Sequence, residues 1–307
     1  MILDQYTEST KNWLEQRFKR ASDEGIYFAH QPIYGFRKGH SGDWVINSYT
    51  ITYQILKALS CIEFDSLLDV GGAEGYTAAL VKNVFNVNVT SCDLSSEACN
   101  RAKEIFGVNG KAVDIHKLPF EDNEFDVVVC SETIEHVPDF RLATNELLRV
   151  CKKAVVITVP HESEAVIENN IKEKIPHAHI HCFDEGSFDF TKQVVEKITA
   201  KKMLDTRLNI PRAIVEAKKR TENETDYSST FVRIYNFLRP AFGLLFGKKS
   251  VEFLMKADEH LSKKTNNYSG LIFVLLKDKN FAYEIPRINV LPEQIVNFVV
   301  PYHYLRK

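Results

Sequence analysis

The sequence lacks several features that would place it in a special class. It has no Cys-x-x-Cys pair among its six cysteines and no internal repeat. No apolar run approaches the roughly 20 residues that a helix needs to span a bilayer, and the first residues lack the basic and then apolar layout of a signal peptide. Scattered cysteines are typical of reduced thiols rather than of a disulfide framework, so we expect a cytoplasmic protein.

The composition is that of a globular protein with an uneven distribution of charge. The 307 residues are 44% hydrophobic and 26% charged, which suffices for one sizeable core with an appendage. From residue 201 onward, 19 Lys and Arg stand against 11 Asp and Glu, whereas the first 200 residues carry 20 against 30. The acidic first part argues against a nucleic-acid partner, because phosphate binding needs concentrated positive charge. The basic last third is either a solvated surface or a surface for phosphates or anionic lipid.

Strands and helices alternate between about residues 50 and 160. Short apolar runs predict strands at 66–70, 87–92, 127–130 and 154–159, and amphipathic or helix-forming stretches predict helices at 48–60, 76–83, 95–106 and 140–150. This alternation is typical of an α/β fold with a doubly wound, Rossmann-like, mostly parallel sheet. Ligands of such sheets bind outside the carboxyl ends of the strands.

The remaining sequence predicts flanking parts around this core. We divide the chain into a helical and aromatic lid segment (1–47), the core (48–211), a mostly helical insertion that caps the substrate (212–265), and a final strand with a tail (266–307). Within these parts we expect a helix at 187–201 and strands at 204–210 and 270–276. Tyr34 and Arg37 are the lid residues best suited to reach a ligand, Arg37 by pairing with a carboxylate.

A glycine-rich turn follows the first predicted strand. The run Leu-Leu-Asp-Val-Gly-Gly-Ala-Glu-Gly ends at Gly75, and a helix-like stretch begins at Tyr76. Glycines let the backbone approach a ligand, and the first N–H groups of the helix point at it. Asp93 ends the second strand, where an acidic side chain can accept hydrogen bonds from ribose hydroxyls. The glycine spacing does not match the Gly-x-Gly-x-x-Gly fingerprint of nicotinamide enzymes.

Four motifs in order carry a resemblance to a known family. The segments LLDVGGAEG, CDLS, AVDIHKLPFEDNEFDVVVCSETIEHV and AVVITVPHE resemble class I S-adenosylmethionine-dependent methyltransferases, over roughly residues 48–200. The resemblance is to the ubiquinone-type, small-molecule O-methyltransferases. It implies a seven-stranded sheet with a helical segment before it and a helical insertion before the last strand. The middle glycine of the usual motif is Ala73 here, and we expect this small side chain to be tolerated.

The resemblance also implies which residues bind S-adenosylmethionine. Asp69 and Gly71 would contact its amino-acid end, with Gly72 beside them and Gly75 allowing the next helix to approach. Asp93 would hold the ribose and Leu94 would pack on the adenine. The remaining implied contacts are Asp114 and Ile115 with the adenine and Ser131 with the methionine portion.

Acids and histidines follow the strand at 127–130. Glu132, Glu135 and His136 share a helical face, which suits a divalent cation. Similar Glu-x-x-Glu-His and later His-x-Phe elements occur in small-RNA 3′-terminal ribose methyltransferases, where they bind a metal, so His181 is the fourth candidate ligand for Mg²⁺ or a similar ion. Alternatively, His136 is a metal-free general base or a structural residue. His161, after the strand at 154–159, is a second candidate base.

These observations lead to one favoured function and two alternatives. We expect methyl transfer from S-adenosylmethionine to a hydroxyl of a small or carrier-linked acceptor such as a sugar, polyketide or quinone. The alternatives are an RNA 3′-terminal ribose methyltransferase with a divalent metal and a non-catalytic regulatory partner that binds the cofactor. The aromatic stretch 231–249, flanked by Arg and Lys, either contacts a membrane surface or forms a buried helix pair, divided at Pro240, over the substrate.

Overall fold

The structure is a computed structural model, and it describes residues 2–23, 43–205, 209–211 and 227–298. Tyr34 and Arg37, the predicted lid residues, lie outside the described residues, as does the first part of the predicted insertion (212–226).

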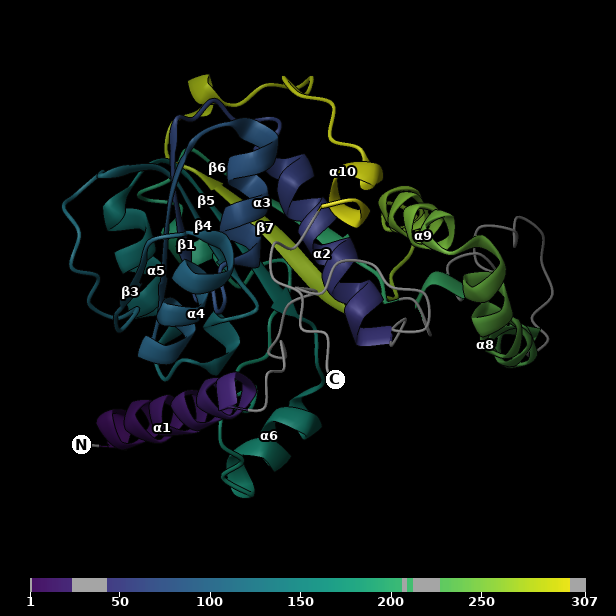
Figure 1. The fold of residues 1–307 in the computed structure, drawn as a ribbon, viewed down its shortest axis with the longest axis horizontal. Helices are drawn as coiled ribbons and strands as arrows, with labels where there is room; N and C mark the ends of the chain where they lie inside the picture. The colour runs from purple at the N-terminus through teal and green to yellow at the C-terminus, as the bar shows by residue number, and fades with distance from the viewer. Residues whose placement is uncertain (1, 24–42, 206–208, 212–226, 299–307) are drawn as a thin grey trace.

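A single seven-stranded sheet forms the centre of the described structure (Figure 1). Its strands are β1 (Ser66–Val70), β2 (Asn88–Asp93), β3 (Gly110–Ala112), β4 (Phe125–Ser131), β5 (Cys151–Pro160), β6 (Lys197–Met203) and β7 (Gly270–Leu276). The spatial order is β3-β2-β1-β4-β5-β7-β6, and only β7 runs antiparallel to its neighbours. The predicted Rossmann-like, seven-stranded, mostly parallel sheet is confirmed.

Helices cover both faces of this sheet. They are α1 (Ile2–Asp23), α2 (Asp43–Leu59), α3 (Tyr76–Phe85), α4 (Ser96–Phe106), α5 (Phe140–Val150), α6 (Glu164–Lys172), α8 (Tyr227–Phe246), α9 (Lys248–Leu261) and α10 (Pro292–Val296). Residues of α2, α3 and α10 share one apolar core with one face of the strands, and α5 packs in the core on the other face. Figure 1 shows α1 below the sheet and α8 at the outer edge, beyond α9.

The core explains why the central strands are apolar throughout. Successive strand residues point to opposite faces, so Leu67 packs in the core of one face and Leu68 in that of the other. Both side chains are fully buried. Because both faces are covered, the strands read as continuous apolar runs rather than alternating ones, as is usual for parallel sheets.

The predictions for residues 187–210 were wrong. The segment 187–201 contains no α-helix, and the strand β6 lies at Lys197–Met203 instead of at 204–210. In β6 the small or apolar Ile198 and Ala200 pack on the core, while lysines occupy much of the rest of this edge strand. The basic residues hide the period-two pattern, and the pairing partner β7 follows almost 70 residues later, so the sequence nearby gives little indication of the strand.

The helical insertion is present in the described part, but Pro240 does not divide it. Helix α8 runs through Pro240, and the break between α8 and α9 falls at Gly247, whose φ is 52°. Glycine adopts a positive φ without the strain that a Cβ would add. The apolar side chains of α8 are also largely exposed rather than buried as a helix pair. Among the described helices, none is both long and apolar enough to cross a membrane.

Gly75 offers a test of the packing that positions the turn after β1. Its φ is 78°, and a Cβ there would lie 2.9 Å from the Cβ of Ala102 in α4. Gly107 has a similar φ of 65°, and a Cβ there would have no other atom within 4 Å, so Gly107→Ala should cost only the backbone strain, about 1 kcal/mol. Gly75→Ala should cost roughly 3 kcal/mol, because strain and overpacking add. Urea unfolding of both variants measures the difference, and equal losses would contradict this account of the contact.

Candidate active site

The carboxyl ends of β1, β2 and β4 border a first cavity, which helix α1 covers. Its lining residues on the sheet side are Val70, Gly71, Ala73, Cys92, Asp93, Leu94, Val113, Asp114, Ile115, His116, Ser131, Glu132, Thr133, His136, Val137 and Pro138. This location is where open α/β sheets bind ligands. Six of the nine residues predicted to bind the cofactor line this cavity: Gly71, Asp93, Leu94, Asp114, Ile115 and Ser131.

The glycine turn is constrained by its neighbours. Gly71 has a φ of 73°, and a Cβ there would overlap the side chain of Thr133. Ala73 adopts a φ of 46°, a left-handed conformation that its Cβ makes costly but not prohibitive. Its N–H donates a 3.0 Å hydrogen bond to Oδ2 of Asp93, which stabilises the turn against β2.

Asp93 lines the first cavity. The N–H of Ser95 donates to its Oδ1 at 2.9 Å, so each carboxylate oxygen accepts one backbone hydrogen bond and keeps further acceptor capacity. Burial raises the pKa of Asp93 to about 6, although the backbone N–H groups of Ser95 and Ala73 lower it. An ionised acceptor pair facing a cavity is suited to a ribose diol.

Asp114 also lines the first cavity, and His116 holds its carboxylate in place. Its Oδ1 accepts the N–H of His116 at 2.9 Å and lies 2.7 Å from Nδ1 of the same residue. The side-chain hydrogen bond with His116 lowers the pKa of Asp114, which favours the ionised form at neutral pH. Ser131 shares a 2.9 Å hydrogen bond with Thr158 at the end of β4.

Three of the residues predicted to bind the cofactor do not line the first cavity and lie beneath its wall. Asp69 is 1% exposed and does not line the cavity, and burial raises its pKa to about 7. Gly72 packs against it, since a Cβ there would lie 2.8 Å from Oδ2 of Asp69. Gly75 faces α4 instead of the cavity. Their predicted contacts with the cofactor therefore stay predictions, while their roles in shaping the turn follow from the geometry.

Helix α1 supplies a cover that the sequence does not assign to particular residues. The residues of α1 that line the first cavity include Tyr6, Thr10, Leu14 and Phe18. Their spacing of four residues places them on one face of a helix, and this spacing is the feature of the sequence that could have identified them. Glu15 on the same helix accepts hydrogen bonds from the N–H groups of Ser96 (2.6 Å) and Glu97 (3.1 Å). This carboxylate at the first turn of α4 holds the cover in place.

A second cavity of about 550 Å³ adjoins the first. The residues common to both linings are Ser48, Ile51, Glu132 and His136. The other residues around the second cavity are Arg17, Asn47, Thr50, Glu135, Pro160, His179, Met203, Leu204, Asp205, Ser269 and Gly270. Its volume lies in the range of small-molecule sites. The shared wall places an acid and a histidine between the two cavities.

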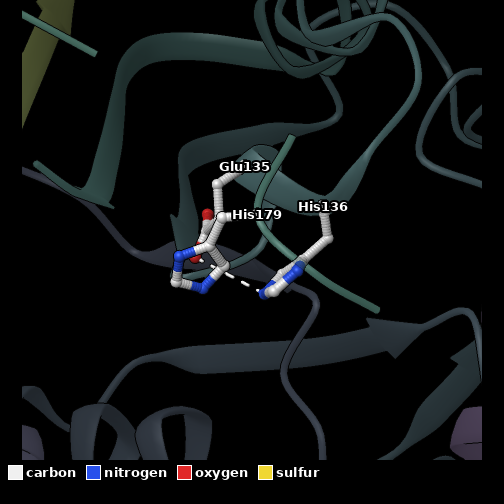
Figure 2. Close-up of side chains that lie close together, drawn as sticks. All are labelled: Glu135, His136 and His179. Atoms are coloured by element: carbon white, nitrogen blue, oxygen red, sulfur yellow. Dashed lines mark ion pairs between the residues drawn. The ribbon is translucent and has the colours of Figure 1, made fainter. Parts of the chain in front are cut away.

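Glu135, His136 and His179 form a compact cluster in the second cavity (Figure 2). One ligand atom from each lies within 4.8 Å of the others. The Glu135 side chain is completely buried, neither of its oxygens makes a hydrogen bond, and Oε1 lies 3.6 Å from Nε2 of His136. Burial and the neighbouring carboxylate of Glu132 raise the pKa of Glu135 well above its usual range.

The hydrogen-bonding partners of the two histidines orient their rings. Nδ1 of His136 lies 3.2 Å from the carbonyl oxygen of Ala178, which can only accept, so Nδ1 carries the proton. Nδ1 of His179 lies 2.9 Å from Oε2 of Glu162 and lowers the pKa of that carboxyl. With the proton on Nδ1, a neutral His136 ring keeps its lone pair on Nε2. In His136 this lone pair faces the Glu135 carboxylate, an arrangement that a shared proton or a cation would stabilise.

Two other predicted histidines lie outside this cluster. The prediction of His181 as a ligand of the same ion is not supported, because its Nε2 is 2.7 Å from the carbonyl oxygen of Val137 and its ring packs on Phe140. His161 lines neither cavity: its Nδ1 lies 2.8 Å from the Phe183 carbonyl oxygen and its ring stacks on Tyr268. His179, which the sequence alone does not distinguish from an exposed loop residue, lies beside Glu135 and His136 instead.

Comparisons with known proteins agree with this geometry. A family model described as a methyltransferase domain matches residues 68–159. A rice protein, 2-methyl-6-phytyl-1,4-hydroquinone methyltransferase 1, is 36% identical over 28% of this chain and 27% of its own length. A fatty-acid O-methyltransferase of Mycolicibacterium smegmatis is 23% identical over 73% of this chain and 87% of its own. Among solved structures, the [4+2]-cyclase SpnF has a TM-score of 0.51 at 16% identity, covering 87% of this chain and 95% of its own.

The fold, the first cavity and these matches together define the class of protein. The chain carries a class I S-adenosylmethionine-dependent methyltransferase domain, as the motifs predicted. S-adenosylmethionine is the cofactor of this class, and the residues around the first cavity fit it, since Asp93 and Asp114 present carboxylate acceptors there for hydroxyl and amino groups. The match to the rice protein spans about a quarter of that protein, so the shared part is the domain and not the whole chain.

The pKa of Asp93 predicts how cofactor binding depends on pH. The carboxyl is protonated below about pH 6 and then loses acceptor strength toward the ribose. Affinity for S-adenosylhomocysteine should therefore fall about tenfold between pH 7 and pH 5, the linkage limit for one proton. Isothermal titration calorimetry at several pH values measures this. Asp93→Asn should bind weakly with a flat profile, and an unchanged slope in that variant would assign the titration to another group.

Proposed function

We propose that this protein transfers a methyl group from S-adenosylmethionine to a hydroxyl oxygen of a small or carrier-linked acceptor, with a quinone-like or lipid-like molecule as the favoured class. The observation that carries the proposal is the contact between the two cavities, which share Glu132 and His136. A donor in the first cavity and an acceptor in the second would meet across this wall. Such alignment is the main requirement of an in-line displacement.

The lining of the second cavity supports an oxygen acceptor. A hydroxyl attacks the methyl carbon as it loses its proton, so a group that accepts this proton or stabilises the oxyanion lowers the barrier. Nε2 of His136 carries a lone pair at the boundary of the two cavities. The name of one relative, a fatty-acid O-methyltransferase, also supports an oxygen acceptor. The name of the other, which refers to a phytyl hydroquinone, supports a quinone-like or lipid-like molecule without naming the methylated atom.

As the alternative to a metal-free base at His136, the same cluster supports a divalent cation, which would take the Nε2 lone pair and stabilise the acceptor oxyanion in place of the ring. Glu135, His136 and His179 are the residues that would hold it, with Glu132 beside them. Each histidine has its Nδ1 next to a carbonyl or carboxylate oxygen, the arrangement that orients metal-binding histidines. When bound, such an ion lowers the pKa of a coordinated hydroxyl. The buried carboxylate of Glu135, which has no hydrogen bond, would gain a charge partner.

Methyl transfer from radiolabelled S-adenosylmethionine to a panel of acceptors tests the function. The panel contains a hydroquinone, a catechol, a fatty acid and an RNA with a 3′-terminal diol. We expect an oxygen-methylated small molecule. His136→Ala should lower kcat by about a hundredfold, the usual loss for a proton-transfer group, with S-adenosylhomocysteine affinity nearly unchanged.

The matched control for this experiment is His161→Ala, because His161 lines neither cavity. We expect its kcat to stay near that of the unaltered protein. Binding of the cofactor with no transfer to any acceptor would instead favour a regulatory role, and preferential methylation of the RNA would replace the small acceptor.

Cation binding can be measured without turnover. Titration of the chelator-treated protein with Mn²⁺ should show one site. Glu135→Gln and His179→Gln should each weaken it by at least about tenfold, the lower bound seen even for residues that only orient metal ligands. His181→Gln, whose ring is directed to Val137, should leave it unchanged.

Two results would contradict the cation site. One is the absence of Mn²⁺ and Mg²⁺ binding to the chelator-treated protein together with unaltered turnover in chelator, which would leave His136 as a metal-free base. The other is a larger loss of binding in His181→Gln than in His179→Gln, which would restore the ligand set first expected from the sequence.

A further inference from the structure

Helix α8 exposes an unusual number of large apolar side chains. Phe237 is 82% exposed and Leu245 is 79% exposed. Ile234, Leu238, Leu244 and Phe246 are each more than half exposed, and Phe242 is 40% exposed. Folded proteins rarely present contiguous apolar patches unless another molecule covers them. We call these seven residues the α8 face.

The α8 face is a single stripe of the helix. At 100° per residue, its seven side chains fall within about 200° of the helical circumference, and Arg233 and Arg239 lie at the two borders of the stripe. Figure 1 shows α8 at the outer edge of the molecule, with α9 between it and the sheet. An apolar stripe with basic borders is the pattern of a helix that lies in the plane of a lipid surface.

The charged residues between positions 227 and 251 have one sign. The sequence from Tyr227 to Val251 contains four basic residues, Arg233, Arg239, Lys248 and Lys249, and no Asp or Glu. Lys249 contacts Glu252 of α9 at 2.7 Å, so part of this charge is compensated locally. Pairing of the α8 face with the same face of a second copy would bring like charges together, because a two-fold interface places each patch against itself. An anionic surface would not have this cost.

We propose that the α8 face docks this protein on a membrane surface that contains anionic lipid. Phe237, Leu245 and their neighbours enter the boundary between headgroups and acyl chains. Arg233, Arg239 and Lys248 remain at the level of the lipid phosphates, with their aliphatic stems along the apolar stripe. Each basic residue near such a surface adds to the attraction, and salt weakens it.

The docking surface is connected to the second cavity by packing. Leu254 of α9 shares an apolar cluster with Ile46 of α2 and with Leu204, and Leu204 lines the second cavity. The adjoining residues Asn47 and Ser48 of α2 line the same cavity. A membrane-bound α8 is therefore linked through α9 to the wall of this cavity. The consequence, access for a lipid-like acceptor, rests on the proposed function, whereas docking itself does not.

Vesicle flotation of the full chain tests the docking. Vesicles of phosphatidylcholine alone are compared with vesicles that also contain phosphatidylglycerol. We expect at least about tenfold stronger binding to the anionic vesicles, from two or more basic contacts, and release at high salt. Phe237→Ser combined with Leu245→Ser should weaken binding at least about tenfold, because two large apolar side chains no longer enter the lipid.

The controls separate docking from folding and from catalysis. Ile285→Ser combined with Val194→Ser removes two exposed apolar side chains outside α8 (80% and 57% exposed) and should bind vesicles like the unaltered protein. All variants should bind S-adenosylhomocysteine equally, which shows that they fold. Flotation measures binding and needs no turnover. The docking result can therefore be interpreted even if no methyl transfer is detected.

Three results would overturn the docking proposal. The first is equal binding to neutral and anionic vesicles, or no binding to either. The second is unchanged binding of the Phe237→Ser and Leu245→Ser variant. The third is a dimer, detected by analytical ultracentrifugation, that dissociates in that variant, because the α8 face would then be covered by a second copy of the chain.

Discussion

The close contact between Gly71 and Thr133 is the constraint on which the site depends. A side chain at Gly71 would overlap Thr133, so the turn after β1 and the loop after β4 approach as closely as two segments can. This approach follows from the pairing of β1 with β4 in the centre of the sheet. It brings the floor of the first cavity next to Glu132 and His136, which form the wall of the second. One steric requirement thus determines where the two cavities adjoin, which is where the proposed function places the methyl donor and its acceptor.

The two cavities contain buried carboxylates in two different electrostatic environments. Asp93 is buried but accepts backbone hydrogen bonds from Ala73 and Ser95, so its charge is supported by the turn itself. Glu135 is equally buried and has no such support. A carboxylate left in this state is costly unless a proton or a cation accompanies it. The first group is therefore part of a rigid binding surface, whereas the second is a site whose charge depends on what enters the cavity.

Much of the fold could be predicted from local patterns, and the exceptions have physical reasons. The strands β1, β4, β5 and β7 are apolar because both of their faces are covered, and this signal is contained within each segment. The edge strand β6 depends on pairing with β7, and its lysines conceal the alternation, so the local pattern predicted a helix there. The break at Gly247 instead of Pro240 depends on a backbone conformation that the local sequence does not specify.

The site shows the same division between local and long-range information. Asp93 and Ser131 lie at the carboxyl ends of β2 and β4, so their position at the first cavity could be predicted from the strands. Asp114 stands after β3, which the local pattern did not predict, and only the family resemblance pointed to it. The proximity of His179, and not His181, to Glu135 and His136 could not be predicted, because His181 is directed to the distant carbonyl of Val137. The cover formed by α1 likewise requires knowledge of where Glu15 meets α4.

A crystal structure of the protein with S-adenosylhomocysteine tests the central claim most directly. The account predicts adenine beside Asp114, ribose hydroxyls on Asp93, and the sulfur atom directed across the shared wall toward His136 and the second cavity. A sulfur atom directed away from the second cavity, or a ligand bound outside the first, would contradict it.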